Sequence, residues 1–283
     1  MGEKREMFDY LLRGDLSGLE LSQLSRPLEE VASGNSCFGP MREWHEWLLF
    51  LLPRLIVESM SPHRRRLQEL LVSAVMSEYW DVTQPGPYRE FHSDLLHSLG
   101  QVIMDRSKWS NGSPILGRVL HAPSDASNAP WGWWEASGDL SSSLFFCLKY
   151  LGPERIGAWV RSVVAIEDPH WMAQLLVWLE GAQSLLRTPG LQPKDVFMRE
   201  PRVDWESSHV LDGNYGADRS PSVLKSPLLP SANKQAFLAA VREVLSEEAL
   251  QQWRQEIGRI DYLAQETSHI IETPTAFQWL ACE

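Results

Sequence analysis

Three helical segments joined by very short links, between residues 137 and 186, constrain the fold of this chain more than any other feature. The first, SGDLSSSLFFCLKYLG, offers Ser137 or Asp139 as its capping residue and ends at a glycine. The second begins at Pro153, and the third begins with Asp168 as the cap and a proline directly after it. Because links of one to three residues force successive helices to fold back on each other, we predict packed antiparallel helices here.

Helical spacing also extends to both sides of this region. Residues 87–109 place their apolar side chains on one stripe, and residues 40–58 are apolar almost all round from Trp47 to Leu52, which predicts a buried helix. Ser246 precedes two glutamates, as expected at a helix start. No alternating pattern long enough for a strand occurs, and no fixed period marks a regular solenoid. The prediction is an all-α fold, either a multi-helix bundle or an irregular HEAT-like helical repeat with a long proline-rich loop.

The proline-rich loop sets the expected domain organisation. Six prolines and three glycines fall within residues 188–232, where the helical spacing stops. A stretch of this length without regular structure is uncommon inside a compact domain. We therefore expect a main helical domain over 1–187, a loop or linker over 188–232, and C-terminal helices over 233–283 that pack on the same domain.

Charge and cysteine content limit the compartment and the partners. The chain has 26 basic and 37 acidic side chains, a net charge of −11, so an extended basic face for nucleic acid is not expected. Its three cysteines, Cys37, Cys147 and Cys282, form no CxxC pair, which favours a reducing compartment and argues against structural zinc. The longest apolar run, residues 47–57, is too short to cross a bilayer. A cytoplasmic protein without membrane contact or cofactor is expected.

Standard catalytic signatures are absent from the sequence. It contains no GxxxxGK[ST], HExxH, GxSxG or GxGxxG motif. The first hypothesis is therefore a non-enzymatic protein–protein interaction module of the immunity or adaptor type, with another protein as its partner. Two alternatives stay open: an enzyme with an unfamiliar, metal-dependent site, and a small-ligand binder with a tryptophan-lined pocket.

A tryptophan cluster in a loop-like stretch is the first candidate binding site. The segment NAPWGWWEASGD, residues 128–139, carries Trp131, Trp133 and Trp134. Exposed tryptophans are typical of binding hot spots. The chain is rich in tryptophan throughout, however, with 13 in total, so the same loop could fold back and fill a core. We take the core as the first reading and a binding surface as the alternative.

Two further segments offer candidate ligands. Arg64, Arg65 and Arg66 fall in the first turn of an expected helix, where the helix dipole disfavours cations. They could bind an anion or an acidic partner, or pair with neighbouring acids such as Glu69. The segment DGNYGAD, residues 212–218, has some features of a calcium loop, but it departs from the EF-hand pattern at several positions, so a polar turn is the default.

One histidine and one polar stripe complete the candidates. Glu90, Asp94 and His97 share one face of the helix expected over 87–109, and such a set could hold a metal or exchange a proton. This face lies opposite the apolar stripe, so a solvated surface is the simpler reading. His92 falls inside the apolar stripe, where a core role is the default and a functional pocket the alternative.

Overall fold

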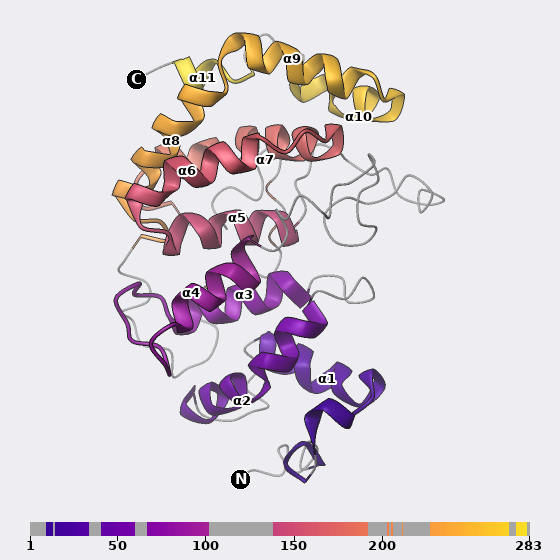
Figure 1. Ribbon diagram of the computed structural model, residues 1–283, viewed down its shortest axis with the longest axis vertical. Coiled ribbons are helices and arrows are strands. Elements are labelled where there is room, and N and C mark those ends of the chain that lie inside the picture. Colours follow the sequence, from indigo (N-terminus) through magenta and orange to yellow (C-terminus); the bar gives the residue numbers. More distant parts are fainter. Residues whose placement is uncertain are drawn as a thin grey trace. The chain divides into compact units, whose positions relative to one another are not determined.

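A computed structural model describes residues 10–13, 15–33, 41–59, 67–101, 138–191, 203, 205, 211, 227–271 and 276–281 (Figure 1). Its contacts divide the chain into two compact units, residues 1–85 with 206–226 and residues 86–205 with 227–283. Across these described ranges the regular elements are helices and no strand occurs, which confirms the all-α prediction. None of the described helices is both long enough and apolar enough to cross a membrane.

The described part of the first unit consists mainly of the helices α1, α2 and α3, which contact one another. They span Leu21–Ala32, Met41–Ser59 and Leu67–Glu78, after a short 3-10 turn at Leu16–Gly18. The indole N–H of Trp44 donates to the carbonyl of Val31 at 2.8 Å, which ties the start of α2 to the end of α1. The imidazole of His45 lies 2.8 Å from a carboxylate oxygen of Glu78 and joins the start of α2 to the end of α3.

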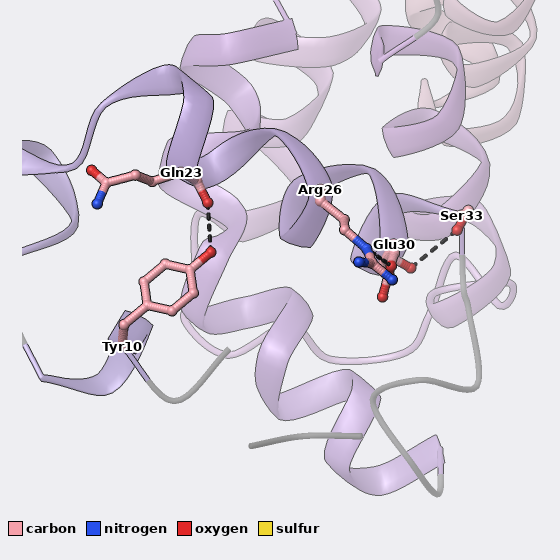
Figure 2. Close-up of polar contacts among 5 residues, drawn as sticks. All are labelled: Tyr10, Gln23, Arg26, Glu30 and Ser33. Carbon is pink, nitrogen blue, oxygen red and sulfur yellow. Dashed lines mark hydrogen bonds and ion pairs between the residues drawn. The ribbon is translucent and has the colours of Figure 1, made fainter. Parts of the chain in front are cut away.

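Local polar contacts fix both ends of α1, as Figure 2 shows. The hydroxyl of Tyr10 donates to the carbonyl of Gln23 at 2.6 Å, which holds the preceding turn against the first turn of the helix. One turn further on, Arg26 and Glu30 form an i,i+4 ion pair at 2.7 Å. The hydroxyl of Ser33 donates to the carbonyl of Glu30 at 3.1 Å. Ser33 thus meets a carbonyl that the C-terminal end of the helix leaves without a partner. The Gln23 carbonyl needs a donor for another reason, because the residue four positions later is Pro27, which has no N–H.

Helix α2 corrects one expectation from the sequence. It is a single helix that contains Pro53, but it is buried on one side only. Trp44, Leu48 and Leu51 are buried, whereas Phe50 is 42% exposed and Val57 60% exposed. Because α1 and α3 are the helices that contact α2 in the described part of this unit, the remaining face of α2 keeps its apolar side chains in solvent.

The second unit contains the remaining helices. These are α4 Phe91–Leu95, the π-helical turn η4 Leu96–Gln101, α5 Gly138–Tyr150, α6 Pro153–Val164, α7 Pro169–Arg187, α8 Ser231–Val244, α9 Glu247–Gly258, α10 Asp261–Ile271 and α11 Gln278–Ala281. The predicted helix starts are confirmed: Pro153 opens α6, and the carboxylate of Asp168 accepts from the first N–H groups of α7. Helix α8 packs along α6, and α9 and α10 pack against α7 (Figure 1).

Helix α5 is buried on nearly all sides, and side chains from residues 227–234 bind its C-terminal carbonyls. The amide of Asn233 donates to the carbonyls of Leu148 and Leu151, both at 2.8 Å. The ammonium of Lys234 does the same for the end of α7, where it donates to Leu185 and Thr188. Segments 82 and 85 residues apart in sequence are thereby joined at the end of α5, and segments 46 and 49 residues apart at the end of α7.

A row of aromatic rings runs through the core of the second unit. Phe145 stacks on Trp205 with 5.3 Å between ring centroids and lies 5.2 Å from Trp178. Phe237 lies between Trp178 and Trp159, at 6.0 and 6.1 Å. Such offset and edge-to-face contacts add to the stabilisation from buried area. Trp159 and Trp178 are buried here, and the helix tryptophans Trp44, Trp47 and Trp171 are buried as well.

Candidate functional site

The exposed face of α2 is the first candidate site in the described residues. Phe50, Pro53 and Val57 are spaced i, i+3 and i+7, so their side chains leave the helix on one face. All three are exposed, and the ring of Phe50 rests edge-on against buried Trp47 at 5.8 Å. The three residues form a continuous apolar stripe, which we call the α2 stripe.

Paired charges flank the α2 stripe. Arg42 and Glu46, one turn before it, approach to 3.5 Å, and Arg54 and Glu58, beside it, approach to 2.9 Å. Each pair has i,i+4 spacing and no net charge. The stripe therefore has an apolar centre and a polar, electrically balanced border, which is the composition of a protein interface with its rim.

A pocket in the second unit is the second candidate site. It lies among α5, α6, α7 and α8, and its lining consists of Leu, Val, Phe and Trp side chains. The space that a water-sized sphere can enter amounts to about 10 Å³, which is room for about one water molecule. Trp159 and Val163 of α6 belong to this lining, together with Leu175 of α7 and Phe237 of α8. No ionisable side chain belongs to this lining.

Two indole groups near this pocket are buried without a hydrogen bond. Within the described residues, no acceptor meets the Nε1–H of Trp159 or that of Trp178. In contrast, the Nε1–H of Trp171 donates to the carbonyl of Val163 at 2.8 Å. A buried N–H without a partner costs roughly 1–3 kcal/mol. Trp159 lines the pocket, whereas Trp178 lies in the core beside it.

The polar stripe predicted on the helix after residue 87 is a surface feature. Glu90, Asp94 and His97 are all exposed, and a carboxylate oxygen of Asp94 accepts from the hydroxyl of Tyr88 at 2.9 Å. Among the residues that the structure describes, no group of three or more His, Cys, Asp or Glu side chains is arranged to hold a metal ion. The arrangement agrees with the solvated reading of this stripe.

His92 is half-buried and packed between aromatic rings. Its imidazole stacks on Tyr150 at 6.3 Å between centroids and meets Phe91 edge-on at 5.5 Å. This placement on the apolar side of α4 matches its position in the sequence pattern. No catalytic partner is assigned to it by these contacts, and its functional role stays a prediction.

The other sequence candidates lie outside the described residues. These are the tryptophan loop with Trp131, Trp133 and Trp134, the arginine run Arg64, Arg65 and Arg66, and the polar segment 212–218. Whether the tryptophans fill a core or form a binding surface therefore stays open, as do the anion and calcium readings.

Two buried ionisable groups of the second unit have structural roles. Burial raises the pKa of Asp168, but hydrogen bonds from His170 and from the backbone N–H of Trp171 outweigh it and hold the pKa below its ordinary value. This carboxylate thus caps α7 in its charged form. Burial raises the pKa of the Cys147 thiol, which keeps the sulfur protonated and unreactive.

Neither the α2 stripe nor the pocket was among the predicted sites. A helical wheel separates Phe50 and Val57 from Leu48 and Leu51, but the wheel alone does not tell which apolar face is covered. The pocket combines residues from positions 144 to 245, so no local pattern marks it.

The chain matches no known protein family, and neither a curated protein nor a solved structure is significantly similar to it.

Proposed function

We propose that this protein is a non-enzymatic interaction module that binds another protein through the α2 stripe. The observation that carries the proposal is the exposure of Phe50, Pro53 and Val57 on one face of a helix whose other face is packed. Apolar side chains grouped in this way, with paired charges around them, are typical of an interface centre.

The dimensions of the α2 stripe indicate the kind of partner. From Phe50 to Val57 the helix rises about 10 Å, or two turns. Three partly exposed side chains supply far less than the roughly 800 Å² per partner of a standard stable interface. A symmetric dimer through this stripe alone would be weak. We therefore propose that α2 docks its three anchors into an apolar groove of a different protein, in the manner of a helix in a groove.

The wider hypothesis of an immunity- or adaptor-type protein rests on the same interaction. The net charge of −11 supports a protein partner rather than nucleic acid. A low cysteine content, with the thiol of Cys147 buried, supports action in the cytoplasm.

Site-specific photo-cross-linking tests this proposal. A photoreactive phenylalanine analogue replaces Phe50 in one sample and Val82 in a control sample, because Val82 of the same unit is 43% exposed but lies off α2. Both proteins are irradiated in a lysate of the source organism, and cross-linked products are identified by mass spectrometry. We expect one protein to be captured from position 50 and not from position 82, and to be lost when V57D is added.

Three results would contradict the proposal. They are the absence of a product from position 50, identical products from both positions, and capture of a second copy of the chain alone. Circular dichroism melts of each variant establish that the fold is retained.

A further inference from the structure

We infer that the partner of the α2 stripe presents a neutral aromatic hydroxyl, the chemistry of a tyrosine side chain, to the main-chain carbonyl of Leu49. This inference rests on the proposed function, because it adds one polar contact to the apolar docking of α2. It follows from the position of Pro53 inside the helix.

Pro53 leaves one carbonyl of α2 without its usual donor. In an α-helix the carbonyl of residue 49 accepts from the N–H of residue 53, but proline has no N–H. Among the residues that the structure describes, no donor from another segment bonds to Leu49. In the free protein water can supply the donor, because Pro53 is exposed and Leu49 is half-buried.

Helix α1 of the same unit contains the same arrangement with a donor in place. Pro27 leaves the carbonyl of Gln23 without an intrahelical donor, and the hydroxyl of Tyr10 donates to this carbonyl at 2.6 Å (Figure 2). Tyrosine suits this contact because its ring is apolar and its tip is a hydrogen-bond donor. The contact shows which side chain a proline-released carbonyl can bind in this protein.

Docking of the α2 stripe would take the Leu49 carbonyl out of water. This carbonyl points along the helix axis toward Pro53, which lies in the middle of the stripe between Phe50 and Val57. A groove that covers the three anchors therefore covers the carbonyl as well. A buried carbonyl without a donor is unfavourable, so a groove lined by hydrocarbon alone fits the stripe poorly.

The border of the stripe favours a neutral donor over a charged one. Both arginines beside the stripe already face a glutamate, at 3.5 and 2.9 Å, so the border has no net charge to balance a cation. A lysine or arginine of the partner would lose its hydration in the apolar interface without gaining an anion. Aromatic side chains are enriched at interface centres, and tyrosine adds the single hydroxyl that the carbonyl requires.

The test observes the Leu49 carbonyl directly, with phenol as the probe. The chain contains two Leu-Phe sequences, Leu49–Phe50 and Leu144–Phe145. Leucine labelled with ¹³C at the carbonyl and phenylalanine labelled with ¹⁵N therefore give two carbonyl signals in a nuclear magnetic resonance spectrum of the full chain. Leu144 is buried in α5, where residue 148 is a leucine with an N–H, so its signal is the internal control.

We expect phenol to move the Leu49 carbonyl signal downfield and to leave the Leu144 signal unchanged. Anisole keeps the ring and the oxygen but has no hydroxyl proton, so it should not reproduce the shift. In P53V the valine N–H bonds to the Leu49 carbonyl while the apolar surface is retained, so the response to phenol should be lost. P53A also regains the N–H and serves as a second variant, and circular dichroism establishes that both keep the helical fold.

Four results would overturn the inference. Three concern the probe: no phenol shift at Leu49, an equal shift with anisole, and an unchanged phenol shift in P53V and P53A. The fourth concerns a protein captured through position 50, which should bind P53V about tenfold more weakly than the wild type, as the loss of one hydrogen bond implies; equal affinity would contradict this. Because the phenol measurement needs no partner, its failure is distinguishable from a failed cross-link, which would contradict the proposed function.

Discussion

The amide of Asn233 offers a quantitative test of how the second unit is held together. It is 3% exposed and donates to the carbonyls of Leu148 and Leu151, each at 2.8 Å. In N233A both carbonyls at the end of α5 lose their donor in a site that water does not reach. Each orphaned buried acceptor costs roughly 1–3 kcal/mol, so the variant should lose about 2–6 kcal/mol of unfolding free energy. The isosteric N233D should lose more at neutral pH, because a carboxylate would face two carbonyl oxygens.

Urea unfolding followed by circular dichroism at 222 nm measures this loss. Gln235 lies on the same helix but is exposed, so Q235A serves as the matched control and should change stability by less than about 0.5 kcal/mol. A midpoint shift in N233A no larger than that of Q235A would refute the reasoning, because it would mean that the end of α5 needs no partner from residue 233.

Three further predictions concern other contacts of the second unit. Hydrogen bonds at the start of α7 hold the pKa of Asp168 below its ordinary value. The stabilisation of the wild type relative to D168N, about 1 kcal/mol, should therefore be full above the unfolded pKa near 4 and should vanish as the pH falls through the folded pKa. Urea midpoints of both proteins at pH 7 and pH 2 test this. The carboxylate of Glu180 accepts from the indole N–H of Trp279 at 2.9 Å and from the backbone N–H of Phe277, whose φ of 62° is unfavourable. E180A should therefore speed amide hydrogen exchange at residues 276–281, while exchange in α6 stays unchanged. A Cβ on Gly100 would lie 2.7 Å from Sγ of Cys147, so G100A should cost about 1–3 kcal/mol, and C147A should recover part of that loss in the double variant.

The fold class and many helix boundaries could be predicted because they depend on local signals. Pro153, Asp168 and Ser246 start helices through their own backbone and side-chain chemistry, which a single sequence displays. The boundary of the two units after Pro85 lies in a PGP sequence that indicates a turn, but a turn does not show that the helix contacts divide there, because that depends on tertiary packing. The same limit applies to Asn233, whose partners lie more than 80 residues away.

The candidate sites were harder to predict than the fold. The sequence pattern correctly located His92 on the apolar side of its helix, and Glu90 and Asp94 on the exposed side, because position on a wheel follows from the helical period. It could not tell that one apolar face of α2 would stay uncovered, since the covering helices are set by tertiary packing. Exposure of Phe50 is thus a property of the assembled unit, not of the segment that contains it.

A substitution at Val163 tests how tightly the core among α5, α6, α7 and α8 is packed. Val163 is 5% exposed and lines the small apolar pocket there, so V163I adds one methylene beside that space. Where the pocket accepts the added group, burial of one methylene should stabilise the fold by about 0.8 kcal/mol. Where the surrounding atoms leave no room, the added group should instead destabilise the fold by about 1–3 kcal/mol. We expect stabilisation, and a decrease in the urea unfolding free energy of V163I would contradict the expectation.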